Sequence, residues 1–131
     1  MPRLETIMKD FRDLRVWNEA HQVTLAIYRA TAHFPREELY GLTSQMRRCS
    51  VSIGANIAEG CGKRGNNEFQ RFLVIASGSA SELDYELLLA HDLSYLDQEA
   101  YRSLHENLSR LRKMLSALLQ KVDADRCVAK C

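Results

Sequence analysis

Residues 60–65 read GCGKRG and have the G-x-G-x-x-G spacing with which a backbone turn can hold a dinucleotide pyrophosphate. This spacing has that meaning only after a strand and at the start of a helix in a βαβ unit. The apolar pattern before it is helical, and the sequence contains no strand-forming run. A P-loop is excluded as well, because it needs glycine at Ile57 and serine or threonine at Arg64. We therefore expect Gly60 and Gly62 to end a helix in a left-handed turn.

Metal-binding residue types are present, but not at a recognised spacing. None of the four histidines follows a glutamate by three residues, which is the spacing of di-iron sites in helical bundles. The four cysteines form no C-x-x-C pair. Cys49 and Cys61 lie among apolar and small residues, where a free cysteine usually serves as a small hydrophobe. We therefore expect neither a metal ion nor a cofactor.

The serines offer no nucleophilic site. Segments 50–55 and 76–81 are rich in serine, alanine and glycine, yet no motif places an oriented base beside a serine. Small residues on facing helices instead allow the helices to approach closely. The sequence thus predicts a protein that is not an enzyme and has no small-molecule substrate.

Basic residues are the remaining candidates, as contacts to phosphate. Lys63 and Arg64 precede a predicted helix, whose N-terminal N–H groups and dipole favour an anion. Five basic residues stand against two acidic ones between positions 41 and 71, although the whole chain has a net charge of only +1. Such contacts need no base readout. A solvated basic turn is the open alternative. The candidate nucleic-acid-binding residues are Arg47, Arg48, Lys63, Arg64 and Arg71.

These candidates are carried by four predicted helices of an all-α domain. Apolar residues recur at alternating steps of three and four, as on the buried face of a helix. Short connectors between long helices favour an antiparallel, up-down-up-down four-helix bundle. We assign residues 1–122 to this single domain and 123–131 to a flexible C-terminal tail. The predicted helices span residues 13–34, 42–60, 67–91 and 98–122.

The chain contains no window that approaches the roughly 18 uninterrupted apolar residues of a membrane span. Its first residues, MPRLETIMKDFRDL, do not form a secretion signal. We therefore expect a cytoplasmic protein without a membrane partner.

The third predicted helix, 67–91, has more apolar surface than one neighbouring stripe covers. Besides its regular stripe it carries further apolar residues near both ends, and a helix that is apolar on most sides is buried on most sides. In a small domain, this indicates contact with another copy of the chain. The candidate interface residues are Phe72, Ile75, Leu88 and Leu89.

Asn56 and Glu59 stand one turn apart near the end of the second predicted helix, just before Gly60. They either form a local polar network that fixes the following turn or contact a partner, because a partly buried polar group needs a hydrogen-bonding partner. We favour the first interpretation and treat Asn56, Glu59 and Gly60 as a structural polar motif.

Three segments carry a family resemblance: FRDLRVW, FPREELYGLTSQMRRCSVSIGANIAEG and FQRFLVIASGSASELDYELLLAHDLSYL. In order and spacing they resemble the four-helix-bundle family of 23S rRNA intervening sequence proteins, over residues 11–120. Arg47 and Arg48 match the paired arginines of that family, the NIAEG motif is at 56–60, and Lys63 lies in the basic turn. Gly54 stands where many members have proline, and the tail has no counterpart in the family.

The resemblance implies a homopentamer without known catalytic activity. Members are similar to the accessory variability determinant protein of diversity-generating retroelements, a pentameric barrel that associates with a reverse transcriptase and binds nucleic acid. This raises the hypothesis of a ring-like homo-oligomer that binds RNA or a nucleic-acid-handling protein through its basic surface residues. The alternative is a protein-protein interaction scaffold whose arginines pair with acidic residues. Salt distinguishes the two, since phosphate binding weakens steeply as salt rises.

Overall fold

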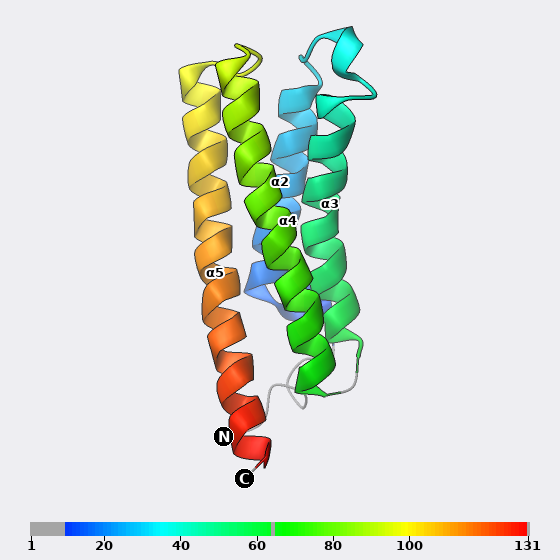
Figure 1. Ribbon diagram of the computed structural model, residues 1–131, viewed down its shortest axis with the longest axis vertical. Helices are drawn as coiled ribbons and strands as arrows, with labels where there is room; N and C mark the ends of the chain where they lie inside the picture. The colour runs from blue at the N-terminus through cyan, green and yellow to red at the C-terminus, as the bar shows by residue number, and fades with distance from the viewer. Residues whose placement is uncertain (1–9, 64, 131) are drawn as a thin grey trace.

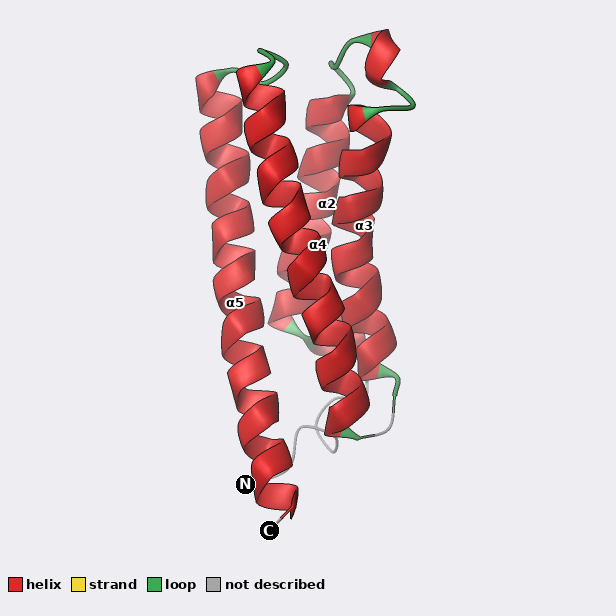
Figure 2. Ribbon diagram, viewed as in Figure 1, coloured by secondary structure: helices red, strands yellow, loops and turns green. Residues whose placement is uncertain are grey.

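The computed structural model describes residues 10–63 and 65–130, with side chains up to Asp125. Two short 3₁₀ helices, η1 (Phe11–Asp13) and η2 (Arg36–Glu38), precede the first and second long helices. The described residues contain no strand (Figure 2). The predicted all-α class with four long helices is therefore confirmed. The long helices are α2 (Arg15–Thr31), α3 (Leu42–Cys61), α4 (Asn66–Asp92) and α5 (Gln98–Lys130).

The four long helices lie side by side (Figure 1). The connection from α2 to α3, which contains η2, lies at one end of the molecule, and the connection from α3 to α4 lies at the other end. The connection from α4 to α5 returns to the first end. α3 packs against both α2 and α4, and α5 packs against both α4 and α2. The first and last long helices therefore meet, although they are far apart in the sequence.

The core lies along the centre of this arrangement, where each helix contributes one apolar stripe. On α2, the buried residues Val16, Ala20, Val23 and Ile27 follow the alternating steps of three and four that the sequence shows. The other helices follow the same rule. Fully or almost fully buried side chains include Ile53, Ile57, Leu73, Leu83, Leu87, Leu108, Leu111 and Leu115.

Helix ends differ from the predicted ones where local contacts continue or stop the chain. α2 ends at Thr31, before the predicted end at 34, although Phe34 is still buried. The helix predicted to end at 122 continues to Lys130. Val122 is fully buried, and the Gln70 amide donates a hydrogen bond to the Asp123 carboxylate. These contacts hold the late part of α5 against the start of α4.

The glycines of the GCGKRG segment have roles other than the predicted one. Gly60 is helical and buried, and a Cβ at this position would lie 2.8 Å from Phe72 Cβ and 3.0 Å from Phe69 Cδ1. Gly62 follows α3 with a φ of −83°, so neither glycine takes the left-handed conformation. Gly65, which precedes α4, has a positive φ of 85° with ψ at 156°. Gly60 therefore permits the close approach of α3 and α4, and the backbone conformation that favours glycine occurs at Gly65.

Among the described residues, none of the helices combines the length with the apolar character needed to cross a membrane.

Candidate functional site

A groove of about 350 Å³ runs between α3 and α4, lined mainly by polar side chains. The small residues of both helices bring the two backbones together here, and Ala76 and Ala80 are fully buried. The Ser52 and Ser79 hydroxyl oxygens lie 2.9 Å apart and share a hydrogen bond across the interface. The groove is lined by Gln45, Arg48, Cys49, Ser52, Ser79 and Glu82.

Asn56 belongs to this interface. Its amide donates to the Ser52 carbonyl at 2.7 Å and to the Ser52 hydroxyl at 3.0 Å, so it extends the serine bridge by one turn. Glu59 is exposed, and Gly60 packs on Phe72. The three residues of the predicted polar motif thus have different roles, and only Asn56 takes part in a hydrogen-bond network with its neighbours on α3 and α4.

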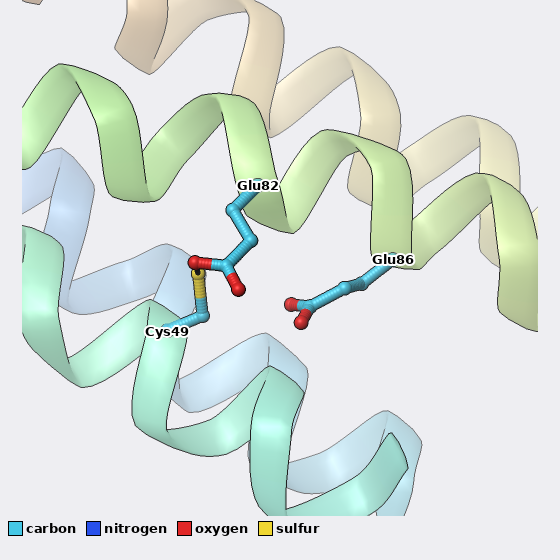
Figure 3. A group of neighbouring side chains, drawn as sticks. All are labelled: Cys49, Glu82 and Glu86. Carbon is cyan, nitrogen blue, oxygen red and sulfur yellow. Dashed lines mark hydrogen bonds between the residues drawn. The ribbon is translucent and has the colours of Figure 1, made fainter.

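Two residues of the groove, Cys49 from α3 and Glu82 from α4, form a cluster of three titratable side chains with Glu86 of α4 (Figure 3). One ligand atom from each residue lies within 4.8 Å of the others. The Cys49 thiol donates to the Ser79 carbonyl at 3.0 Å and approaches Glu82 Oε2 at 3.5 Å. The cluster therefore joins two helices through groups that change their charge with pH.

Glu86 is the unusual member of this cluster. Its side chain is buried, with 3% exposure of the residue, and neither carboxylate oxygen has a hydrogen-bond partner among the described residues. Burial, followed by repulsion from Glu82, raises the pKa of Glu86 to about 7. Burial and the same two carboxylates also raise the pKa of the Cys49 thiol. A positive charge close to the cluster would therefore stabilise the ionised forms of all three groups.

This cluster was missed by sequence reasoning, which looked for Glu-x-x-His pairs and interpreted Cys49 as a small hydrophobe. A usable signal exists in the YELLLA segment, where Glu86 interrupts an apolar run. Glu82 stands four residues earlier, on the same face of the helix. The contribution of Cys49 depends on how α3 lies beside α4, which the sequence pattern does not specify.

The structure describes four of the five candidate nucleic-acid-binding residues and separates them. Arg47 and Arg48 lie near the start of α3, and Lys63 follows its end. At a rise of about 1.5 Å per residue, Arg48 and Lys63 are roughly 20 Å apart along the helix. Arg64 lies outside the described residues. The four described candidates therefore do not form a single patch.

Arg47 has a local role at the end of α2. Its Nε donates to Thr31 Oγ1 at 2.8 Å, and its guanidinium lies 4.8 Å from the centre of the Tyr28 ring. Nη2 also reaches the Tyr28 carbonyl oxygen at 3.4 Å, and a cation is favourable at the negative end of a helix dipole. Arg47 therefore joins α3 to α2, whereas Arg48 is exposed.

The cationic groups of Lys63 and Arg71 both lie near the aromatic ring of Phe72. Lys63 Nζ lies 5.8 Å and Arg71 Cζ 4.4 Å from the centre of the Phe72 ring, and both cations are exposed. Arg71 also forms an ion pair with Glu68 at 3.2 Å. The N-terminus of α4 follows Gly65 without a side-chain cap. Two cations thus flank a helix end that itself favours anions.

The candidate interface residues on α4 fall into two groups. Phe72 is buried within the chain, and Leu89 is half-buried against the core. Ile75 and Leu88 remain exposed, at 41% and 44%. Val74 and Tyr85 are even more exposed. Tyr85 follows Val74 by eleven residues, about three helical turns, and Leu88 follows Tyr85 by three, so these three residues lie on one side of the helix with Ile75 next to Val74. α4 therefore carries an exposed apolar stripe formed by Val74, Ile75, Tyr85 and Leu88.

A second apolar surface lies between α2 and α3. It is a groove of about 360 Å³, lined mostly by apolar atoms of Trp17, Val51, Ala55 and their neighbours. The Trp17 ring is stacked on His21, with ring centres 5.1 Å apart. The α2–α3 groove and the α4 stripe are different surfaces of the same chain.

The chain has two informative similarities to known proteins. The family model for the 23S rRNA-intervening sequence proteins matches residues 12–117. A solved structure of a protein of unknown function from the S23 ribosomal protein family of Bacteroides thetaiotaomicron VPI-5482 is similar, with 25% sequence identity and a TM-score of 0.72. That similarity covers 79% of this chain and 97% of the other. No curated protein matches the chain.

Proposed function

Since the chain belongs to the 23S rRNA-intervening sequence protein family, we propose that it is a non-enzymatic, up-down-up-down bundle that forms a ring-like homo-oligomer and binds RNA. The family is of unknown function, and the related solved structure is described in the same way. The proposal is supported by the surfaces of this chain. The similarity to the accessory variability determinant protein, and the pentamer that it implies, stay predictions.

The observation that carries self-association is the presence of two different apolar surfaces on one chain. The α4 stripe exposes Ile75, Tyr85 and Leu88, and the α2–α3 groove offers the side chains of Trp17 and Val51. When one surface of a subunit contacts a different surface of the next, the contact is heterologous and generates a ring if the rotation closes. An exposed apolar stripe of this kind marks an interaction site. We place the α4 stripe of one subunit in the α2–α3 groove of its neighbour.

RNA binding is assigned to the turn between α3 and α4. Lys63 and Arg71 each lie near the Phe72 ring, and the adjacent N-terminus of α4 has no side-chain cap and favours anions. Such a site contacts phosphate without reading base sequence. A single site of two cations is weak, but a ring repeats it in every subunit, and linked sites bind one strand more tightly than separate ones.

A protein-binding scaffold is the second candidate. It is favoured by the ion pairs that already engage basic residues, including Arg110 with Glu19 at 2.9 Å and Arg112 with Asp84 at 2.9 Å. These pairs leave fewer cations for phosphate. The two candidates share the same oligomer and differ only in their response to RNA.

Light scattering on the purified chain, at low and moderate salt and with and without a short structured RNA, tests both self-association and RNA binding. We expect a mass of about five subunits and added RNA mass at low salt only, because phosphate binding weakens log-linearly as salt rises. A monomer at all concentrations would contradict the ring. An oligomer that gains no RNA mass at low salt would make the chain a protein-binding scaffold.

Matched variants separate the two surfaces. The Lys63→Glu/Arg71→Glu pair should abolish RNA binding and leave the mass unchanged, whereas Arg102→Glu, an exposed arginine on α5, should reduce binding only slightly. Ile75→Glu/Leu88→Glu should dissociate the oligomer, because it places charge on the apolar stripe. Leu39→Glu, at an exposed position outside the stripe, serves as its control.

A further inference from the structure

The cluster of Cys49, Glu82 and Glu86 poses a physical problem that the proposed function does not address. A buried carboxylate without a partner is costly, so proteins pair such a group with a cation or keep it protonated. Protonation does not satisfy Glu86, because neither of its oxygens has a hydrogen-bond partner among the described residues. A cation that contacts the carboxylate directly would remove this cost.

The protein itself does not supply that cation. Among the described residues, the ion pairs involve neither Glu82 nor Glu86. Arg48 lines the same groove, yet it is exposed and makes no ion pair with either carboxylate. The acidic side chains instead point toward the Cys49 thiol, which is a ligand for metal ions when it is deprotonated (Figure 3).

We infer that Cys49, Glu82 and Glu86 form a binding site for a divalent zinc-class metal ion, which links α3 to α4. The donor set contains one sulfur and two carboxylate oxygens, all within 4.8 Å of one another. Hard cations such as Mg²⁺ and Ca²⁺ are held by oxygen ligands, whereas thiolate together with carboxylate suits Zn²⁺ and Co²⁺.

The distances fit a tetrahedral ion. With a Zn–S bond of about 2.3 Å and a Zn–O bond of about 2.1 Å, two ligands at the tetrahedral angle are roughly 3.6 Å apart. Cys49 Sγ and Glu82 Oε2 are separated by 3.5 Å, so these two ligands already stand at the required spacing. Glu86 supplies the third ligand, with a carboxylate oxygen within 4.8 Å of the other two ligand atoms. The groove leaves the fourth position open to water.

Metal binding would change the chemistry of the cluster in a defined way. The S–H bond of Cys49 breaks, its proton goes to solvent, and the sulfur electron pair forms the bond to the metal. A protonated Glu86 likewise releases its proton. The positive ion then balances the thiolate and both carboxylates, and Glu86 gains the partner that it lacks.

Titration of the chelator-treated, full-length chain with Co²⁺ tests this inference. We expect one ion per chain, thiolate-to-cobalt charge-transfer absorption and the visible bands of a tetrahedral ion, all displaced by Zn²⁺. Cys49→Ala should lose the charge-transfer absorption. Cys61→Ala is the matched control that should keep it, since Cys61 does not belong to the cluster.

Glu86→Gln keeps the inference testable if the cysteine variant folds poorly. It conserves the shape of the side chain and removes its charge, so Co²⁺ affinity should fall at least about 100-fold, the upper end of what loss of a group supporting a metal ligand costs. Circular dichroism confirms that each variant is helical. Absence of Co²⁺ and Zn²⁺ binding by the wild type, or absorption that survives in Cys49→Ala, would overturn the inference. Neither result depends on the oligomer or on RNA.

Discussion

Asp84 and Glu86 stand two residues apart on α4, yet they lie in opposite electrostatic surroundings. Asp84 faces α5, where its carboxylate meets Arg112 at 2.9 Å and His105 at 3.5 Å. Glu86 faces α3, and its titratable neighbours are the Cys49 thiol on α3 and the Glu82 carboxylate on α4. At the α4–α5 contact, the partly exposed Asp84 is paired with a cation of the same chain. At the α3–α4 contact, Glu86 is buried without a cation among the described residues, so its negative charge is not compensated there.

The largest expected effect in this comparison is the pH dependence of the unfolding free energy that Glu86 causes. Its pKa is about 7 in the folded chain and near 4.5 in the unfolded one. A raised carboxyl pKa gives a stability contribution that is fully present below the unfolded pKa and is lost as pH rises through the folded pKa. Between pH 4.5 and pH 7, the metal-free wild type should therefore lose roughly 3 kcal/mol of unfolding free energy relative to Glu86→Gln.

Urea unfolding of both proteins in chelator, from pH 4.5 to pH 8, measures this difference. Glu106→Gln, at an exposed position on α5, is the matched control and should follow the wild type closely. Parallel curves for the wild type and Glu86→Gln would show that Glu86 is solvated in the folded chain, and the contrast with Asp84 would disappear.

A second test adds one methyl group at either of two glycines: Gly60 of α3, which packs against α4, or Gly78 of α4, which is exposed. Gly60→Ala places its Cβ 2.8 Å from Phe72 Cβ, so the α3–α4 contact must open, at a cost of about 1–3 kcal/mol. Gly78→Ala meets nothing within 4 Å on the chain and should stabilise the helix by about 0.5–1 kcal/mol. Thermal unfolding of both variants measures the two effects. Destabilisation by Gly78→Ala would indicate that another subunit packs there.

The smallest expected effect is that of Asp84→Asn, which should lower the free energy of unfolding, whereas Glu86→Gln should raise it in the metal-free chain at pH 8. Asp84→Asn removes the partly exposed ion pair with Arg112 and the contact with His105, and should destabilise the chain by about 0.2–1 kcal/mol. The loss should shrink in 1 M salt, because exposed charges are screened there. Neutralising Glu86 should stabilise the metal-free chain at pH 8, whereas neutralising Asp84 should not. If both substitutions shift the urea midpoint in the same direction, the proposed contrast between the two contacts is wrong.

The sequence predicted more of the fold than of the candidate site. The helical stripes were predicted from the sequence. The sequence also has a proline at position 35, shortly after α2, and an aspartate at position 97, directly before α5, whose carboxylate accepts the Ala100 N–H at 2.8 Å. The role of Gly60 was not predicted, because a close approach to Phe72 belongs to the pairing of two helices. The separation of Arg48 from Lys63 follows from helix length and was readable in principle.

The four long helices follow from local sequence, since helix periodicity and helix ends depend on residues within a few positions of one another. The family membership is carried by the same local segments. Which side chains meet between helices depends on how the helices pack, because a small shift of α3 along α4 would exchange the neighbours of Cys49 without changing either apolar stripe. The meeting of Cys49 with Glu82 and Glu86, and the pairing of Asp84 with Arg112, are results of that packing.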